Sequence, residues 1–478
     1  MKKLILFSLA CSMAVLSVAQ HDSKSNYYPP TDPLVQQKLD QWQDLKFGLL
    51  MHWGPYSQWG IVESWSICSE DEGWCRRNMD NYTDYKVKYE NLQTTFNPTK
   101  FDPQKWAKAA ADAGMKYVVF TTKHHDGFCM FDSRYTDYKI TDAKTPFHKN
   151  SKANVAREIF SAFRAEGLWT GAYFSKPDWH SEYFWWPNFA TPDRMANYSI
   201  KRYPERWEKF VQFTHNQIME LMTDYGPMDI LWLDGGWVKK MTREEIDAYV
   251  HDPDYNFVRM QNQDIRMDEL AAKARQKQPG LIVVDRAVEG PNQNYLTPEN
   301  TVPKEQLNYP WESCMILGGG WSYSFDAKYM SGRQVVHLLT DIVAKGGNLL
   351  LNIGPSPEGT WDPGAYQALE ETGNWMKING ESIYGTRKSA PYYDGPVYHT
   401  KKKDGSAHYI IYCLKEGESL PELFTVRNYI PKEKARIDIL GIKGSVKYEN
   451  TDVGLLIRVP KKVRDTGDQY YAVVFRIQ

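Results

Sequence analysis

The chain lacks an excess of charge of either sign. Its 478 residues carry 58 Lys and Arg against 59 Asp and Glu, which gives a formal net charge of −1. Nucleic-acid binding depends on many contacts between basic side chains and phosphates, so a balanced chain gives no electrostatic argument for it. We therefore expect no nucleic-acid partner.

Long apolar runs are missing after the first 20 residues, so no later segment is predicted to span a bilayer. The first run, residues 4–18, follows two lysines and ends in small residues. That order predicts a secretory signal peptide over residues 1–19 and a polar leader over residues 20–37. The protein is then exported to the periplasm or secreted, and lipid attachment at Cys11 is the alternative.

Cysteine is scarce, and its spacing excludes several common sites. Removal of the signal peptide leaves five cysteines: Cys68, Cys75, Cys129, Cys314 and Cys413. No CxxC pair and no zinc-finger spacing occurs, so a cysteine-bound metal is not expected. Cys68 and Cys75 either pair across their short loop in an oxidising compartment or are reduced like the others.

Motifs for cofactors and hydrolytic metals are also absent. No GxGxxG follows an early strand, so a dinucleotide-binding fold has no support. Residues 345–355 contain a Gly-Gly pair but not the GK[ST] of a phosphate-binding loop, and we interpret them as a late strand. Neither HxH nor HExxH occurs, although a hydrolytic metal needs about three ligands at recognisable spacing. We expect no metal and no organic cofactor.

From about residue 38, short β-branched runs alternate with helical stretches, which indicates βα units and a parallel sheet. The clearest strands are expected at residues 47–53, 117–122, 170–174, 229–233, 281–284 and 348–353. A less clear strand is expected at 312–316, and the pattern does not place the eighth. Helices are expected at residues 103–113, 153–166 and 203–225, among others. Polar side chains follow strand after strand, as they do at the catalytic face of a barrel, whereas a doubly wound sheet binds its ligand at one switch point. We therefore predict an α/β fold, a (β/α)₈ TIM-like barrel, over residues 38–388.

The pattern changes after residue 388. Short alternating runs separated by Gly, Pro and Lys replace the helical stretches. This texture is typical of an all-β sandwich of about 90 residues. We place this C-terminal β-sandwich at residues 389–478.

The most informative strand end carries Trp232 and Asp234, followed by two glycines and a further tryptophan. A carboxylate is a competent nucleophile towards the anomeric carbon of a sugar, so Asp234 is our candidate nucleophile. The other interpretation is an aspartate that caps a helix or holds a turn. Aromatic residues make up 14% of the chain, which suits sugar binding but equally suits the core of a large barrel.

Histidines mark two further strand ends. His124 and His125 follow residues 117–122, and a turn or bulge could present both rings on one side. With Asp126 they suggest a metallohydrolase, but hydrogen bonds from neutral rings to sugar hydroxyls explain the pair better. The first strand and its loop contribute a set that suits a pyranose ring: His52, Glu63 and Trp65.

A glycosidase needs a second carboxyl group as acid and base. Glu289 and Glu299 both lie in a loop rich in Gly, Pro and Asn, after a strand that ends in Asp285 and Arg286. Spacing does not choose between them, and the acid requires a pKa raised by burial or by another carboxylate. Arg286 could pair with either glutamate or contact the sugar.

Taken together, these segments resemble family 29 of the glycoside hydrolases, the retaining α-L-fucosidases. The motifs are KFGLLMHWG (46–54), TKHHDGF (122–128), WLDGG (232–236), VDR (284–286), GGNLLLNIGP (346–355) and NGESIYG (379–385). The resemblance implies Asp234 as the nucleophile. It also implies fucose contacts at His52, Glu63, Trp65, His124, His125, Tyr173, Trp232 and Arg286.

The family's first loop reads Glu-Trp-Tyr where this chain has Glu-Ser-Trp at residues 63–65, so Glu72 and Trp74 are alternative contacts. A Thr-x-Glu element after the Asp-Arg pair implies Glu299, in preference to Glu289, as the acid/base.

The resemblance therefore predicts a cofactor-free retaining α-L-fucosidase. It would remove terminal α-L-fucosyl residues from fucosylated oligosaccharides or glycoconjugates by double displacement. Two alternatives remain open from the residues alone: a non-catalytic carbohydrate-binding barrel, and a metal-dependent hydrolase that uses His124, His125 and Asp126.

Overall fold

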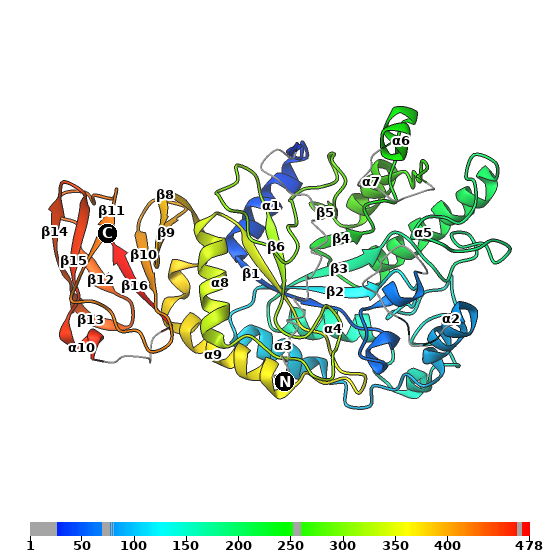
Figure 1. The fold of residues 1–478 in the computed structure, drawn as a ribbon, viewed down its shortest axis with the longest axis horizontal. Coiled ribbons are helices and arrows are strands. Elements are labelled where there is room, and N and C mark those ends of the chain that lie inside the picture. Colours follow the sequence, from blue (N-terminus) through cyan, green and yellow to red (C-terminus); the bar gives the residue numbers. More distant parts are fainter. Residues whose placement is uncertain (1–25, 69–76, 78, 80, 252–259, 466–470) are drawn as a thin grey trace, which may run out of the picture.

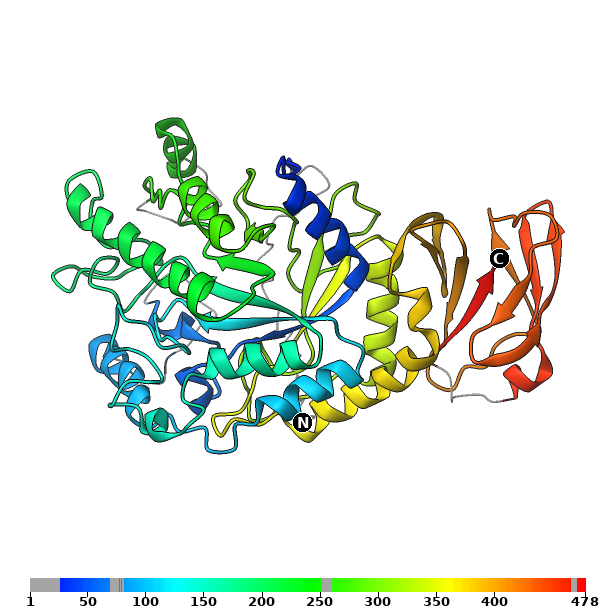
Figure 2. The same ribbon diagram turned by 180° about the vertical axis from the view of Figure 1, so that it is seen from behind.

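The computed structural model describes residues 26–68, 77, 79, 81–251, 260–465 and 471–478. A parallel sheet flanked by helices forms the larger part, and two antiparallel sheets lie at one end of the molecule (Figures 1 and 2). None of the helices in the described ranges is long and apolar enough to cross a membrane. Five predictions fall outside these ranges and stay predictions: the signal peptide, lipid attachment at Cys11, the contacts of Glu72 and Trp74, and pairing of Cys75 with Cys68.

The parallel sheet has seven strands in the order β5-β4-β3-β2-β1-β7-β6. The strands are β1 (Phe47–Met51), β2 (Tyr117–Lys123), β3 (Trp169–Ser175), β4 (Ile230–Asp234), β5 (Ile282–Asp285), β6 (Glu312–Ile316) and β7 (Asn348–Asn352). The helices of this part are α1 (Pro33–Leu45), α2 (Tyr82–Glu90), α3 (Pro103–Asp112), α4 (Val155–Ala165), α5 (Pro204–Asp224), α6 (Arg243–Val250), α7 (Met267–Lys277), α8 (Gly332–Ala344) and α9 (Pro363–Asn379). All seven predicted strands and the three predicted helices are confirmed.

Local sequence explains why the helices begin where they do. The Asp102 side chain accepts a hydrogen bond from Lys105 N and precedes Pro103, which suits the first helical position of α3. The Asn154 side chain caps α4 in the same way by accepting from Arg157 N. These caps satisfy N–H groups that have no partner within the helix.

The barrel interior follows the two-residue period of its strands. Alternate residues of β4 point inward, so Ile230 and Trp232 lie inside the barrel and Asp234 lies above them at its mouth. Trp42 of α1 closes the other end and stacks on Tyr295, with ring centroids 4.0 Å apart. The same alternation therefore fills the core and delivers polar side chains to the carboxyl ends of the strands.

An irregular segment, residues 292–300, takes the place between β5 and β6. Asn294 N donates to Val283 O of β5 at 3.0 Å, and Cys314 N of β6 donates to Pro298 O at 3.1 Å. A proline has no N–H to give to a ladder, so this segment does not form a regular strand. The predicted barrel class is confirmed, with seven regular strands in the described residues and this segment, which carries Glu299, beside them.

The C-terminal part contains the antiparallel sheets β13-β12-β16-β10-β9-β8 and β11-β15-β14. Their strands are β8 (Thr386–Asp394), β9 (Val397–Lys402), β10 (His408–Cys413), β11 (Leu423–Arg427), β12 (Ile437–Ile439), β13 (Ile442–Ser445), β14 (Lys447–Thr451), β15 (Gly454–Arg458) and β16 (Ala472–Ile477), with the short helix α10 (Lys461–Arg464). Buried side chains of both sheets, such as Ile410, Leu455 and Phe475, form one core. The predicted β-sandwich is confirmed, while its boundary at residue 389 stays a prediction.

Helices α8 and α9 join the sandwich to the barrel. Arg333 NH1 donates to Leu414 O at 2.8 Å, and Trp375 Nε1 donates to Ala472 O at 2.9 Å. These side-chain to backbone bonds fix the sandwich against the outer helices, away from the mouth of the barrel (Figure 1).

Replacing Gly48 in β1 by alanine should destabilise the barrel. A Cβ atom there would lie 2.4 Å from the ring of Tyr117, whose hydroxyl is fixed by donation to Glu312. Overpacking of this kind costs about 1–3 kcal/mol in the free energy of unfolding. Denaturant unfolding of Gly48→Ala checks this. Gly320→Ala is the control, because the nearest atom to its new Cβ is 3.8 Å away; equal unfolding midpoints for both variants would contradict the argument.

Candidate active site

Asp234 lies at the centre of the polar mouth of the barrel. Its Oδ2 accepts a hydrogen bond from the Tyr173 hydroxyl at 2.7 Å, and its Oδ1 accepts one from Arg286 NH1 at 3.1 Å. Burial alone would raise the pKa of Asp234, but the charge of Arg286 and the interactions with His125 and Tyr173 outweigh it and hold the pKa well below its usual range. Asp234 is therefore an ionised carboxylate, aimed from a rigid strand.

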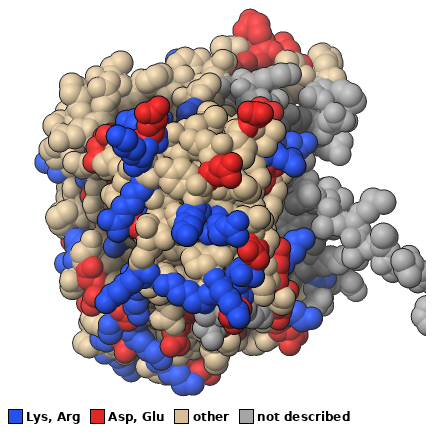
Figure 3. All heavy atoms as spheres, turned by 90° about the vertical axis from the view of Figure 1, so that its left-hand side faces the viewer, with Lys and Arg blue, Asp and Glu red and all other residues tan. Residues whose placement is uncertain are grey.

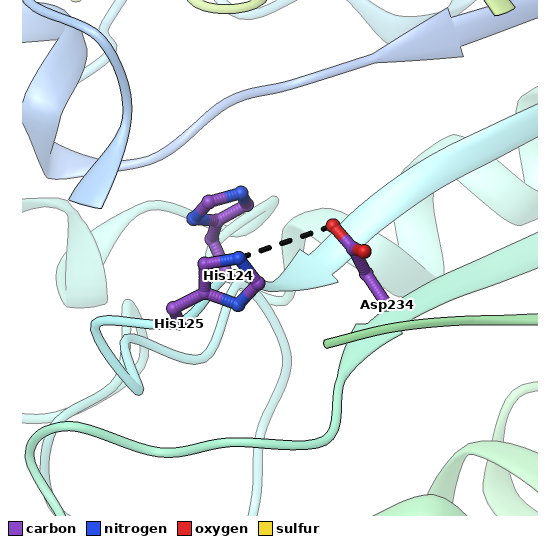
Figure 4. A group of neighbouring side chains, drawn as sticks. All are labelled: His124, His125 and Asp234. Carbon is purple, nitrogen blue, oxygen red and sulfur yellow. Dashed lines mark ion pairs between the residues drawn. The ribbon is translucent and has the colours of Figure 1, made fainter. Parts of the chain in front are cut away.

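His125 and Asp234 point towards one another, and the ring of His124 lies beside that of His125 (Figure 4). Both follow β2, after a register irregularity between Thr121 and Lys123, so the strand's alternation no longer separates them. Their ring centroids are 4.2 Å apart, and His125 Nε2 lies 3.9 Å from Asp234 Oδ2. The prediction that a turn presents both rings together is confirmed.

The two histidines are neutral. Burial lowers the pKa of His125 to about 3 and lowers that of His124 well below its ordinary value. His124 Nδ1 is hydrogen-bonded to Ser64 Oγ, whereas the buried His125 Nδ1 has no hydrogen-bond partner within the described ranges. Neutral rings of this kind can donate to or accept from the hydroxyls of a sugar.

Among the residues that the structure describes, the group that could hold a metal ion is His124, His125 and Asp234, whose ligand atoms lie within 4.8 Å of one another. Asp126, which the metallohydrolase hypothesis included, does not belong to it. Its carboxylate accepts instead from the Tyr89 hydroxyl at 2.8 Å and from Phe128 N at 3.2 Å. At Asp234, the guanidinium and phenol already occupy both oxygens, and a metal cation there would be repelled by Arg286. The site therefore favours chemistry by the carboxylate itself.

The structure separates the two candidate acids. Glu299 Oε2 accepts a hydrogen bond from Arg286 NH2, and its Oε1 accepts one from Trp321 Nε1 at 3.0 Å. Glu289 is exposed and accepts only from the main chain and side chain of Asn26, at 3.4 and 3.3 Å, in the described part of the protein. Two carboxylates that bind the two terminal nitrogens of one guanidinium are neighbours, so Glu299 and not Glu289 accompanies Asp234.

Glu63 and His52 form a further wall of the site, near enough to Asp234 and Glu299 for the charges of these carboxylates to act on both. Glu63 is 1% exposed and accepts a hydrogen bond from Ser322 N at 2.7 Å. Burial, followed by the nearby charges of Glu299 and Asp234, raises the pKa of Glu63 to about 8. Burial lowers the pKa of His52 to about 4, although Asn352, whose Oδ1 lies 2.9 Å from His52 Nδ1, acts in the other direction. The wall thus offers an uncharged acid and a neutral imidazole.

The predicted aromatic contacts have different positions. The ring of Trp65 lies edge-on to His125, with centroids 5.2 Å apart, and borders the site. Trp232 is 2% exposed, stacks on Tyr173 and donates to Glu312 inside the barrel at 3.3 Å. Trp232 therefore forms the layer below Asp234, and its predicted contact with a sugar stays a prediction.

Sequence reasoning missed several residues of the site. Asn352 ends β7 and obeys the same strand-end pattern as Asp234, so that pattern could have found it. Trp321 lies in the loop after β6, and Arg194 lies in the loop after β3 with its guanidinium 4.8 Å from the Trp65 ring centroid. No local signal marks these two, because their roles depend on contacts between distant loops.

Residues 14–381 match the family model described as alpha-L-fucosidase. The chain belongs to the α-L-fucosidase family. The α-L-fucosidase of Dictyostelium discoideum is 25% identical to it over 504 aligned residues, covering 100% of this chain and 99% of the relative. Human tissue α-L-fucosidase is 28% identical and covers 94% of this chain and 91% of its own.

Solved structures of α-L-fucosidases have a fold similar to that of this chain. Isoenzyme 1 from Paenibacillus thiaminolyticus is 28% identical, with a TM-score of 0.73, and covers 93% of this chain and 99% of its own. The Thermotoga maritima α-fucosidase in complex with fucose is 26% identical, with a TM-score of 0.70, and covers 95% of this chain and 100% of its own. The family and fold that the sequence motifs implied are confirmed, and the chain is a glycoside hydrolase.

Glu63 should make the stability of this α-L-fucosidase fall as the pH rises. Its pKa is 4.5 when unperturbed and about 8 in the folded protein, so the folded state holds a proton that the unfolded state releases between these values. The free energy of unfolding then falls by up to about 1.4 kcal/mol per pH unit in this window. Glu63→Gln, which cannot ionise, should flatten this slope in denaturant unfolding measured across the window. Glu289→Gln, at an exposed site, should keep the wild-type slope; parallel curves for wild type and Glu63→Gln would contradict the assignment.

Proposed function

We propose that Asp234 and Glu299 carry out the double displacement by which this α-L-fucosidase releases terminal L-fucose. The observation that supports this pairing is the single guanidinium of Arg286, which binds both carboxylates. Retaining glycosidases need two carboxyl groups about 5–5.5 Å apart, one as nucleophile and one as acid and base. The shared guanidinium keeps Asp234 and Glu299 near one another, which supports this pairing.

In the first step, a carboxylate oxygen of Asp234 attacks the anomeric carbon, and a covalent fucosyl-enzyme forms. Glu299 gives its proton to the glycosidic oxygen as the bond to the leaving group breaks. The Tyr173 hydroxyl, 2.7 Å from Asp234 Oδ2, fixes the orientation of the carboxylate. Positioning on rigid strands keeps the reacting atoms close and lowers the entropic cost of the reaction.

In the second step, Glu299 acts as a base. It removes a proton from water, which attacks the anomeric carbon and releases Asp234. Two successive inversions leave L-fucose with its original configuration. Arg286 stays beside both carboxylates through the cycle and balances the negative charge that moves between them.

We propose that the neutral side chains around Asp234 bind the fucosyl ring: His52, Glu63, Trp65, His124 and His125. The Nε2 atom of His125, which lies 3.9 Å from Asp234 Oδ2, and the protonated Glu63 are groups that can form hydrogen bonds with sugar hydroxyls. The Thermotoga maritima relative in complex with fucose supports fucose as the ligand. The substrate is then a fucosylated oligosaccharide or glycoconjugate, and the first 19 residues support export of the enzyme.

Asp234→Asn should abolish turnover of an aryl α-L-fucoside while the fold stays intact, because an amide cannot act as the nucleophile. Loss of the nucleophile typically lowers kcat by about 10³-fold or more. Steady-state kinetics and thermal unfolding measure the two effects. Asp126→Asn is the matched control, since that carboxylate is held by Tyr89 and Phe128 outside the site, and it should keep most activity. Near-normal turnover by Asp234→Asn would contradict the assignment of Asp234 as the nucleophile. Loss of wild-type activity on addition of a metal chelator would also contradict it.

Glu299→Ala should lose most activity towards natural fucosides, whose leaving groups need a proton. Azide should partly restore turnover of an activated aryl fucoside, because it can attack the fucosyl-enzyme without a general base. Product analysis should then show fucosyl azide. Glu289→Ala, an exposed glutamate of the same loop, should behave like wild type; rescue by azide at Glu289→Ala instead would reverse the assignment.

A further inference from the structure

The near-zero net charge of the chain conceals an uneven distribution. Residues 386–478 carry 17 Lys and Arg against 11 Asp and Glu, although the whole chain has a net charge of −1. The barrel part is therefore acidic and the β-sandwich is basic. A net positive charge on one domain influences how the protein associates with charged partners and does not determine the fold.

Many of the basic side chains lie at one corner of the sandwich, where strands β13, β14 and β15 meet helix α10. We call this set the basic cluster: Lys443, Lys447, Arg458, Lys461, Lys462 and Arg464. Figure 3 views this end of the molecule and shows a band of Lys and Arg side chains across the lower half of the face. In Figure 1 the cluster lies around α10, at the far end from β4 and the active site.

Contacts confirm that these side chains are neighbours. Lys447 of β14 stands directly opposite Arg458 of β15, and both are exposed. Lys462 Nζ donates to the Lys443 carbonyl at 2.9 Å, which places α10 beside β13. The loop between β13 and β14 is short, so the two pairs form one surface.

Few acidic side chains of the described residues pair with this surface. Arg458 and Arg464 share one carboxylate, Glu422, at 3.0 and 3.8 Å. The four lysines of the basic cluster form no ion pair with any described residue. Like charges directly opposite one another on a sheet destabilise it, so the fold gains nothing from this arrangement.

We propose that the basic cluster binds an anionic polysaccharide, whose sulfate or carboxylate groups repeat along the chain. The choice of a glycan rests on the proposed function, because an enzyme that trims fucosylated glycans meets such polymers. Arginine binds sulfate and carboxylate through paired hydrogen bonds, and lysines add charge along the polymer. Single-stranded nucleic acid would need exposed aromatic rings for its bases. Among the described residues of the sandwich, the one large exposed aromatic is Tyr393, on β8, at the opposite edge of the six-stranded sheet from β13.

The test measures binding of the full chain to immobilised heparin, with unsulfated dextran and duplex DNA as comparisons. The triple variant Lys447→Ser, Lys461→Ser, Lys462→Ser should raise the dissociation constant for heparin about tenfold at low salt and reduce its salt dependence, because fewer counterions are released. The matched control removes three exposed lysines from the barrel part, Lys88→Ser, Lys149→Ser and Lys277→Ser, and should change the constant less than twofold.

Three results would overturn the proposal. They are binding to heparin no stronger than to dextran, an equal loss of heparin affinity in both triple variants, and tighter binding to DNA than to heparin at the same salt concentration. Hydrolysis of a small aryl α-L-fucoside should be the same in wild type and both variants, since the basic cluster is remote from Asp234. If the wild type binds heparin through the basic cluster but fails to hydrolyse the aryl fucoside, the proposed function fails and the polysaccharide site does not.

Discussion

The guanidinium of Arg286 is the interaction on which the active site depends. Burial would lower its pKa, but Glu299 and Asp234 raise it well above the ordinary value, so the group is always charged. It lies over the ring of Trp232, 5.5 Å from the ring centroid. Without this cation, two partly buried carboxylates would lie near one another with no opposite charge beside them, which would destabilise the site. The positive charge of Arg286 therefore allows Asp234 and Glu299 to lie near one another at the mouth of the barrel.

Two buried ion pairs near the ends of the barrel strands also require charges to be matched. Lys176, just after β3, donates to Asp285 Oδ1 at 2.5 Å, and Asp285 directly precedes Arg286. Lys123, at the end of β2, pairs with Asp178 at 3.0 Å, and both side chains are almost fully buried. Breaking such a pair leaves an unpaired buried charge, so each pair ties one strand end to a particular loop. These two buried ion pairs hold the strand ends and the neighbouring loops together around the mouth of the barrel.

The sequence predicted those features of the fold and the site that depend on residues close together in the chain. Strand periodicity placed Asp234 and the histidines at strand ends, and the family resemblance chose Glu299 over Glu289, as the geometry does. Asp126 adjoins the histidine pair in sequence but turns away, because a turn after β2 reorients consecutive side chains. Trp321, which reaches Glu299 from another loop, left no local pattern to read. Overall composition also hid the basic sandwich, since opposite charges on two domains cancel in a total.

The two carboxylates sit on supports of different kinds. Asp234 ends a strand hydrogen-bonded on both sides, whereas Glu299 belongs to a segment interrupted by Pro298 and held by scattered bridges. A residue added to β4 would reverse every inward and outward side chain beyond it. A residue added between β5 and Glu299 would only lengthen a loop, at small entropic cost. The barrel thus fixes the position of Asp234, whereas a change in the length of the loop could move Glu299 without rebuilding the core.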